Sequence, residues 1–258
     1  MADIDFSSAD GVARITINRP AMRNACSTAM WSRLSELAHH VEQDRAVRCL
    51  LIAGAGEHFC AGGDLREFKS TLPLSTQDRA RFWANSADVT NGFFMVMERM
   101  PQPVIVSVRG YAAGGGMAVV AAADLAIVSD TARFLAAQIK IGAIPDSGVS
   151  YNMVRSLGLK RAKQLGMLGE TIDATTALSV GLVNWVVPDA ELDVRTEQLL
   201  QRIVQSPGTA MALTKRAFND AWTSSLADHY IQEAKDVADC VRDPDYDRLV
   251  RAFLERSR

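Results

Sequence analysis

Short apolar runs alternate with longer amphipathic segments along the first half of the chain. Strand-like apolar runs occupy residues 3–7, 12–18, 49–53, 104–108 and 125–129. Helical spacing of apolar side chains is found in residues 27–41, 76–100 and 117–123, and Ser27 is expected to cap the first of these helices. Strands and helices that alternate in this order predict an α/β (α+β) fold with layers of sheet.

The pattern becomes mainly helical from residue 150 onward. Residues 150–169 predict one or two short helices, 171–180 another helix and 183–187 a final strand. Beyond residue 189 nearly every segment has helical spacing, with Pro207 and Pro244 as breaks. We therefore expect a core over residues 1–189 and a helical region over 190–258. Amphipathic helices of this kind either cover a core or make contacts between subunits, and the pattern does not decide between the two.

Composition excludes several classes of function. A chain of 258 residues can form one large domain with a substantial core, and a net charge of -2 gives no reason to expect nucleic acid or an anionic membrane as a partner. The longest apolar run, residues 117–128, is interrupted by Asp124 and is too short to cross a bilayer. No secretory leader is recognised, and the four cysteines show no close pairing. These features predict a cytoplasmic protein with reduced cysteines and no metal site.

Two glycine turns are the candidate site of chemistry. The first contains Gly62 and Gly63, and the second contains three consecutive glycines at residues 114–116. Glycine lets the backbone approach a ligand closely, and each turn precedes a segment that reads as a helix, with its positive end toward the turn. Two converging N–H groups would form an oxyanion hole for a carbonyl oxygen. Neither turn has the spacing of a phosphate-binding loop or a dinucleotide site.

Three acidic residues have structural as well as catalytic interpretations. Asp64 directly follows the first turn and is expected to cap a helix, and Asp124 is expected to be a hydrogen-bonded structural acid. Asp146 is either a catalytic base or the N-cap of a helix that begins near Ser147. Burial among its apolar neighbours would raise the pKa of Asp146 toward neutrality, which suits a base. The motif context favours the base.

Five motifs, taken in order, closely resemble the crotonase (enoyl-CoA hydratase/isomerase) superfamily. They are Asn18-Arg19-Pro20 with Arg23-Asn24-Ala25, residues 59–65, residues 103–116, residues 140–148, and Thr214-Lys215-Arg216-Ala217. The resemblance spans nearly the whole chain. It implies a spiral of repeated ββα units, a helical C-terminal trimerisation region, and a homotrimer or a hexamer of two trimers. It also implies an acyl-CoA substrate whose thioester oxygen lies between the amides of Gly63 and Gly115.

The sequence departs from the hydratase pattern at two positions. Hydratases of the superfamily carry two glutamates where this chain has Ala118 and Gln138. Hydration needs a base for water and a proton donor for carbon, and neither replacement supplies both. Asp146 is the remaining acid, at a position that resembles the base of dienoyl-CoA isomerases and of the ring-epoxide (1,2-epoxyphenylacetyl-CoA) isomerases. One carboxylate suffices for isomerisation because it can remove a proton and return it elsewhere.

The resemblance also implies residues that contact coenzyme A and the acyl group. Arg23 would lie near the nucleotide, the Ala61 carbonyl would accept from the adenine amine, and Phe253 and Arg256 would reach the nucleotide of a neighbouring subunit; the two arginines are otherwise solvated surface charges. Further contacts to the substrate would come from Gly62, Asp64, Leu65, Met117, Ala118 and Gln138. An apolar acyl pocket is expected from Leu65, Phe68, Met95, Met117 and Phe134.

Three functional hypotheses follow. The leading one is an acyl-CoA isomerase in which Asp146 shuttles a proton, with no cofactor beyond the coenzyme A of the substrate. The second is a 2-enoyl-CoA hydratase in which Gln138 and Asp146 handle water. The third is a non-catalytic acyl-CoA binding protein that retains the fold.

Overall fold

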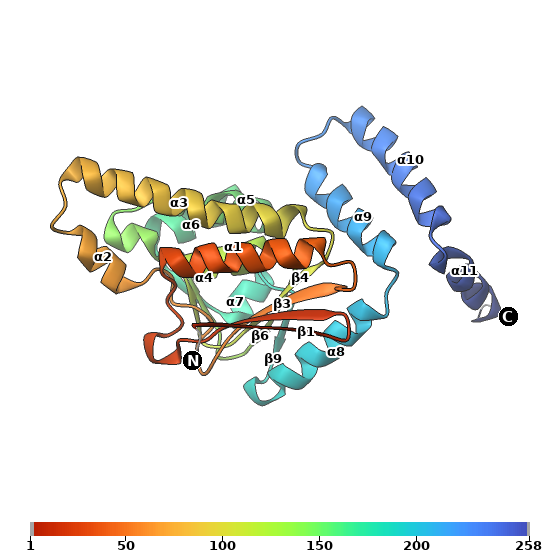
Figure 1. Ribbon diagram of the computed structural model, residues 1–258, viewed down its shortest axis with the longest axis horizontal. Coiled ribbons are helices and arrows are strands. Elements are labelled where there is room, and N and C mark those ends of the chain that lie inside the picture. Colours follow the sequence, from red (N-terminus) through yellow and green to blue (C-terminus); the bar gives the residue numbers. More distant parts are fainter. Residues whose placement is uncertain (1–2, 257–258) are drawn as a thin grey trace.

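A sheet with apolar side chains on both faces forms the centre of the computed structural model, which describes residues 3–256 (Figure 1). Its strand order is β1-β2-β3-β4-β6-β9, and every pair except β1–β2 is parallel. The strands are Ile4–Ala9 (β1), Val12–Ile17 (β2), Cys49–Gly54 (β3), Val104–Val108 (β4), Leu125–Ser129 (β6) and Trp185–Val187 (β9). All five residues of β4 are buried, as expected for a parallel strand covered on both faces.

Helices cover the two faces of this sheet separately. Helices α1 (Thr28–Gln43) and α3 (Thr76–Arg99) lie together on one face, and α8 (Leu192–Val204) packs on the other (Figure 1). The Ser27 hydroxyl accepts a hydrogen bond from the Met30 amide at 3.3 Å, so the predicted cap of α1 is confirmed. The helix α8 begins beyond residue 189 and yet forms part of the core.

A second, smaller sheet positions the glycine turns. It consists of β5 (Tyr111–Ala113), β7 (Arg133–Leu135) and β8 (Thr171–Asp173), with β5 and β7 parallel. The units β4–β5–α4 (helix Gly115–Ala122) and β6–β7–η2–α5 (helices Ala137–Ile141 and Val149–Leu157) each place one strand in each sheet before a helix follows. This arrangement is the repeated ββα unit.

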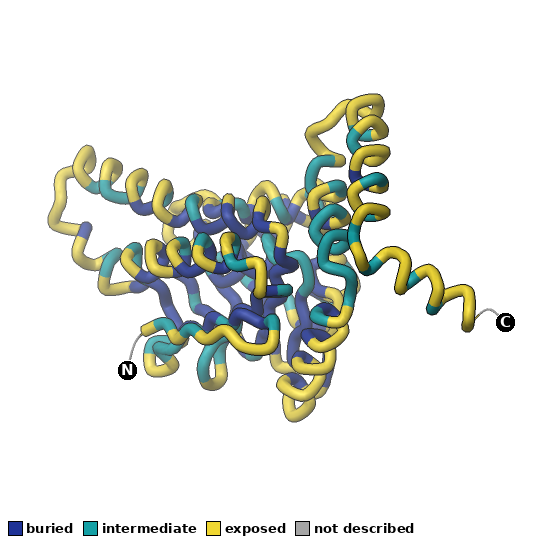
Figure 2. Tube along the Cα trace, turned by 45° about the vertical axis from the view of Figure 1, so that its right-hand side comes forward, coloured by how far each residue is buried: buried dark blue, intermediate teal, exposed yellow. Residues whose placement is uncertain are grey.

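The remaining helices connect or extend this core. They are η1 (Pro20–Met22), α2 (Leu65–Thr71), α6 (Leu159–Leu168), α7 (Ala174–Ser179), η3 (Asp189–Glu191), α9 (Gly208–Asp220), α10 (Leu226–Arg242) and α11 (Asp245–Arg256). Helices α9 to α11 project from the core, and α10 and α11 are largely exposed (Figures 1 and 2). Of residues 3–256, no helix is both long and apolar enough to cross a membrane.

Two predicted elements are wrong in detail. Residues 171–180 do not form one helix, because Thr171–Asp173 pairs with β7 as an edge strand before α7 begins. The helical region has a further break between α9 and α10, where Ser225 caps α10 by accepting from the Asp228 amide. The six- and five-residue strands of the large sheet were predicted, whereas the three-residue strands β5 and β7 were not.

Candidate active site

The two glycine turns are joined by backbone hydrogen bonds. The Cys60 amide donates to the Tyr111 carbonyl at 3.0 Å, and the Ala113 amide donates to the Cys60 carbonyl at 2.9 Å. Gly62 has φ of 100°, and a Cβ there would lie 2.9 Å from the Ala113 carbonyl oxygen. Only glycine permits this approach and this conformation. Residues about 50 positions apart in the chain therefore form a single structure at the ends of β5 and β7.

The two candidate oxyanion-hole amides have no backbone acceptor among the described residues. The Cys26 amide donates to the Gly62 carbonyl at 2.8 Å, and the Asp64 amide donates to the Cys26 carbonyl at 3.0 Å. These two bonds form a parallel β-bridge between Cys26 and Gly63, in which Cys26 bonds to the residues before and after Gly63. The Gly63 N–H therefore points away from Cys26. Gly115 is the first residue of α4, whose leading amides lack partners within the helix. Within residues 3–256 neither amide donates to a backbone carbonyl.

A buried ion pair holds the first turn in place. Nη1 of Arg19 lies 2.9 Å from Oδ2 of Asp64, and both side chains are largely buried. Asp64 also caps α2, accepting from the Arg66 amide at 2.9 Å, which confirms the predicted cap. Burial acts to raise the pKa of Asp64, but the Arg66 amide and the Arg19 guanidinium outweigh it, so this pKa lies below its ordinary value. Arg19 belongs to one of the family motifs, but the sequence did not predict its ion pair with Asp64.

Asp146 lies beside Gln138, although not in the buried environment that the sequence predicted. Nε2 of Gln138 donates to Oδ1 of Asp146 at 3.1 Å. Gln138 is buried, whereas Asp146 and Ile144 are exposed, so the expected burial of this carboxylate among apolar neighbours is wrong. Asp146 does not cap α5 either, because the N-cap is Gly148 and no side chain occupies that role.

The strand topology places Gly115 and Gln138 at the same edge of the small sheet. The strand β5 leads into Gly115, and the neighbouring parallel strand β7 leads into η2, which carries Gln138. The Gly114 amide donates to the Leu135 carbonyl at 3.0 Å and links the ends of the two strands. Ala118 is fully buried in α4. The carboxyl ends of adjacent parallel strands meet at the same edge, which is where ligands bind in many α/β proteins.

The candidate coenzyme A contacts fall into two groups. Arg23 is exposed and has φ of 50°, and its carbonyl accepts from the Ala61 amide at 2.9 Å, so these two residues are adjacent. Asn24, with φ of 58°, fixes this loop by donating to the Ala55 and His58 carbonyls. Phe253 and Arg256 are on α11, at the other end of the molecule from α2 (Figure 1), in a groove of about 550 Å³ with Tyr246 and Pro207. One chain does not bring the two groups together.

The five residues expected to form an acyl pocket do not share one. Met117 and Phe134 belong to the core, while Leu65 is exposed. Phe68 instead contacts the first turn, because a Cβ on Gly63 would lie 2.8 Å from its ring. The Phe68 ring stacks on Trp83 with centroids 4.4 Å apart. This aromatic pair was not predicted, and no sequence signal connects residues 68 and 83 other than their position on helical segments.

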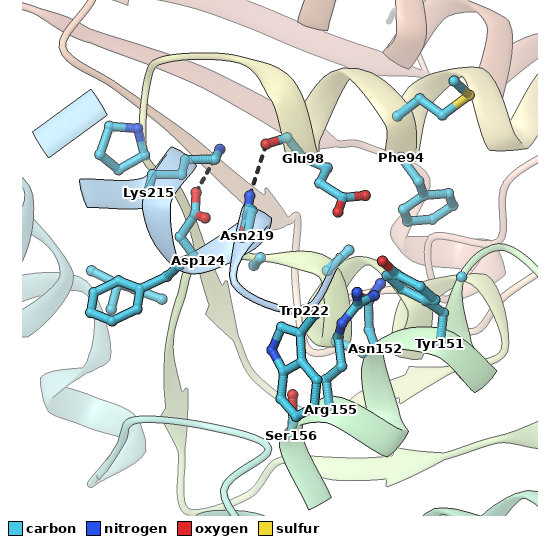
Figure 3. A pocket seen from close by; sticks show the side chains of 18 of the residues that line it. Phe94, Glu98, Asp124, Tyr151, Asn152, Arg155, Ser156, Lys215, Asn219 and Trp222 are labelled. Atoms are coloured by element: carbon cyan, nitrogen blue, oxygen red, sulfur yellow. Dashed lines mark hydrogen bonds and ion pairs between the residues drawn. The ribbon is translucent and has the colours of Figure 1, made fainter. Parts of the chain in front are cut away.

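A cavity of about 710 Å³ lies at the other end of α4 (Figure 3). Its lining includes residues 121–123, Met95 and the labelled side chains of α3, α5 and α9, but neither Gly63, Gly115, Ala118 nor Gln138. Among its ionisable groups, Lys215 pairs with Asp124 at 2.8 Å, and the Arg155 guanidinium lies 3.4 Å from the Tyr151 ring centroid. Nε and Nη1 of Arg155 are buried and have no hydrogen-bond partner among the described residues. Asp124 also accepts from the Val104 amide, so the expectation of a structural acid is confirmed. This cavity is therefore distinct from the glycine turns.

Other side chains give no sign of a metal centre. Among residues 3–256, no group of three or more His, Cys, Asp or Glu side chains could hold a metal ion. Cys26, Cys49 and Cys60 are buried and unbridged, and the sulfurs of Cys26 and Cys60 lie 4.0 Å apart behind the first turn. Their contact was not evident from their spacing in the sequence.

Comparison with known proteins assigns the family. Residues 7–258 match the enoyl-CoA hydratase/isomerase family. The 1,2-epoxyphenylacetyl-CoA isomerase of Escherichia coli K12 is 34% identical over 250 residues, which cover 95% of this chain and 93% of that protein. The short-chain-enoyl-CoA hydratase of Clostridium acetobutylicum is 31% identical, with 95% and 92% covered. The crystal structure of an enoyl-CoA hydratase from Mycobacterium smegmatis has a TM-score of 0.91 at 30% identity, covering 99% of this chain and 97% of that one.

The chain therefore belongs to the enoyl-CoA hydratase/isomerase family, and its fold is the crotonase fold, a mixed α/β core with a C-terminal helical region. Both the recognition made from the motifs and the predicted fold class are confirmed. Relatives named as isomerases and as hydratases both match at similar identity, so family membership does not distinguish the two reactions.

Proposed function

We propose that this protein is an acyl-CoA isomerase in which Asp146 removes a proton from the acyl group and returns it at another carbon. The observation that carries the proposal is the Asp146 carboxylate, held by Gln138 just beyond the end of β7, which is linked to the second glycine turn. Asp64, the carboxylate at the first turn, is already paired with Arg19. Ala118, at one of the two glutamate positions of hydratases, is fully buried and has no ionisable group. A single base that acts twice matches an isomerisation.

The amides of Gly63 and Gly115 would stabilise the enolate oxygen of the thioester. A proton beside a thioester carbonyl is weakly acidic, and its removal places negative charge on that oxygen. Each backbone donor aimed at this position lowers the barrier by about 3 kcal/mol in comparable sites. The coenzyme A moiety would lie along the Arg23–Ala61 contact, where an exposed guanidinium suits phosphate.

The acyl group of the substrate is expected to be apolar, and a ring is compatible with the site. The stacked rings of Phe68 and Trp83 begin at the Gly63 turn and would contact the part of the acyl group near the thioester. The relative from Escherichia coli named for 1,2-epoxyphenylacetyl-CoA supports the inclusion of ring-containing substrates in the test.

The deciding experiment is an activity panel in heavy water. Purified protein is incubated with 2-enoyl-, 3-enoyl- and ring-containing acyl-CoA thioesters, and the products are followed by mass spectrometry and NMR. An isomerase conserves the mass of the substrate apart from deuterium, whereas a hydratase adds one water.

Asp146→Asn keeps size and polarity but removes the proton acceptor, so isomerisation should fall by about 100-fold or more. Glu170→Gln, an exposed carboxylate outside the site, is the matched control.

Other outcomes distinguish the remaining hypotheses. Water addition by the wild-type protein that depends on Asp146 and Gln138 would establish the hydratase, which the similarity to enoyl-CoA hydratases keeps as the second candidate. Saturable binding of acyl-CoA without turnover of any thioester would establish a binding protein. Full isomerase activity in Asp146→Asn would contradict the proposed mechanism.

We also propose that the active form is a homotrimer or a hexamer of two trimers. Exposed apolar side chains on α9 to α11 and on the turn between α9 and α10 support this proposal, among them Phe218, Trp222, Tyr230, Val237 and Leu254. Phe253 and Arg256 would then contact the nucleotide of a neighbouring subunit.

A further inference from the structure

Gln138 and Asp146 form a pair at the edge of the proposed site. The Nε2–H of Gln138 donates to Oδ1 of Asp146, and the glutamine is only 8% exposed. Within residues 3–256, no other hydrogen bond or ion pair reaches the Asp146 side chain. A buried amide thus holds one oxygen of an exposed carboxylate, and none of the described residues bonds the second oxygen, Oδ2.

The backbone fixes both ends of this pair. The Gln138 carbonyl accepts from the Ala143 amide at 3.0 Å, which closes the turn after η2. After Asp146, Ser147 and Gly148 adopt the left-handed conformation, with φ of 55° and 76°. The side chain of Ser147 is buried. The Val149 amide donates to the Asp146 carbonyl at 3.0 Å. Because the main chain is held in this way, the side-chain bond decides where the carboxylate points.

The glutamine amide is oriented with its donor toward Asp146. Oε1 of Gln138 is buried and has no hydrogen-bond partner among the described residues. A rotated amide would place this oxygen against the carboxylate and leave Nε2 without an acceptor. The observed orientation therefore places the one donor group of the Gln138 side chain against Oδ1 of Asp146.

We infer that Gln138 is the positioning residue of Asp146, holding Oδ1 so that the ionised carboxylate presents Oδ2 to the substrate proton. The inference rests on the proposed isomerase function. Oδ2 would take a proton from carbon while the C–H electron pair forms the enolate, and the new O–H bond would then break as the proton returns to a different carbon. Proton and electron pair both return to the product, so no co-reactant is needed.

The charged neighbours of this pair are the same in every variant described below. The elements packed around the turn are β7, η2, α5 and α6, and their charged side chains are Arg133, Lys140, Arg155, Lys160, Arg161 and Lys163. None of them forms an ion pair with Asp146 in the described part of the chain. Glu170 adds a negative charge nearby, since it follows Gly169, which packs against Ile139 and Lys140. Because these charges do not change between the variants, a difference at position 138 reports the substituted side chain.

Two substitutions separate positioning from a merely structural role. Gln138→Met retains the length of the side chain but removes the donor, and Gln138→Glu places a second carboxylate beside Asp146. For Gln138→Met we expect kcat to fall about tenfold with little change in KM. The acidic limb of the pH–kcat profile should move up, because the donor that stabilises the charged carboxylate is lost. Gln138→Glu should move that limb further in the same direction, because like charges oppose ionisation.

A matched control exists elsewhere on the surface. Gln164 of α6 donates to Glu170 at 2.7 Å, which is the same kind of amide–carboxylate bond, and neither residue is bonded to Gln138 or Asp146 among the described residues. Gln164→Met should therefore leave kcat and the pH profile unchanged. Thermal unfolding and circular dichroism establish that each variant is folded. If Gln138→Met does not fold, Gln138→Glu, which keeps size and polarity, provides the comparison.

An NMR titration of the Asp146 carboxyl carbon tests the pair without any substrate. The inference predicts that the midpoint rises from wild type to Gln138→Met and again to Gln138→Glu. Wild-type titration of Asp146 in Gln138→Met, or a loss of kcat with an unmoved pH profile, would overturn it. Failure of the wild-type protein to isomerise any thioester would instead refute the proposed function, while the titration would still decide whether Gln138 controls Asp146.

Discussion

At the scale of single residues, glycines allow the two turns of the candidate active site to contact each other closely. A Cβ on Gly116 would overlap the Cys60 carbonyl oxygen, and one on Gly115 would lie 2.6 Å from the Trp31 ring. Cys60 and Trp31 are themselves buried, so neither can move away freely. Substitution at these glycines would therefore displace the amides proposed to bind the enolate oxygen.

Gly115→Ala should lower the isomerisation rate by about 100-fold, because one oxyanion donor moves out of position. Overpacking against Trp31 should also reduce the free energy of unfolding by about 1–3 kcal/mol. The matched control is Gly92→Ala within α3, where the nearest atom, Ser35 Oγ, lies 3.6 Å away. This control should stabilise the protein by about 0.5–1 kcal/mol and leave the rate unchanged. Steady-state kinetics and urea denaturation measure both effects, and a fully active Gly115→Ala would contradict the assignment.

Asp64→Asn should destabilise the protein in a pH-dependent way. Asparagine still caps α2 but leaves the Arg19 guanidinium without its buried partner, a loss of roughly 3 kcal/mol near neutral pH. Since the pKa of Asp64 is lower in the folded protein, its contribution is complete above the unfolded pKa of about 4 and disappears as the pH falls through the folded value.

The difference in unfolding free energy between wild type and Asp64→Asn should therefore shrink in acid. Urea denaturation at several pH values measures it. The control Glu36→Gln, in an exposed pair with Arg33, should cost less than about 1 kcal/mol at every pH. A difference for Asp64→Asn that does not depend on pH would rule out the ion pair as its cause.

Residue roles set by near neighbours were predicted from the sequence, and roles set by tertiary packing were not. Ser27 and Asp64 cap the helices that directly follow them, so local rules identified both. The exposure of Asp146 and its bond to Gln138 depend on a turn closed by two left-handed residues. The apolar side chains of Phe134 and Met117 would suit a substrate pocket or the protein core equally well, and only the fold shows that they are in the core.

At the scale of elements, one lysine attaches the C-terminal helices to the core. Nζ of Lys215 on α9 donates to the Met97 and Gln102 carbonyls at 2.7 and 3.1 Å and pairs with Asp124 (Figure 3). Burial lowers the pKa of Lys215 and raises that of Asp124, while their mutual attraction opposes both shifts. The helix α9 is thus held by a buried charge at the junction of α3 and β4.

Lys215→Met should lower the free energy of unfolding by about 3–5 kcal/mol, because it leaves Asp124 desolvated without a cation. Amide hydrogen exchange should increase in α9 before it increases in the sheet. Lys235→Met, at an exposed position on α10, is the control and should stay within about 0.5 kcal/mol of wild type. Adding Asp124→Asn to Lys215→Met should recover part of the loss, and no recovery would indicate that packing rather than charge dominates.

Element boundaries followed the sequence pattern where strands were long and apolar. The strands β3 and β4 are almost continuously buried, so their runs were unambiguous. The strands β5, β7 and β8 have three residues each, too few for a period to appear, and their pairing is set by the chain returning from the large sheet. These short strands nevertheless position the candidate site residues. The motifs could therefore identify those residues, but the hydrophobic pattern could not predict how they are arranged.

At the scale of the whole molecule, α10 presents an apolar face that no other part of the described chain covers. Leu226, Tyr230, Val237 and Val241 are spaced to lie on one side of the helix, and all are exposed. Figure 2 shows this helix projecting from the core with little of its surface buried. Monomeric proteins rarely expose a continuous face of this kind, so we expect copies of the chain to cover it.

Light scattering and analytical ultracentrifugation should therefore find a trimer or hexamer at micromolar concentration. Tyr230→Glu combined with Val237→Glu places two charges in the proposed interface and should weaken association by about 100-fold or more, equivalent to roughly 2.8 kcal/mol. The control Lys235→Glu adds a carboxylate to the opposite side of α10 and should leave the assembly intact. If Phe253 and Arg256 complete a neighbour's coenzyme A site, the dissociated double variant should also show a higher KM for acyl-CoA. A wild-type protein that is monomeric at these concentrations would refute the proposed assembly.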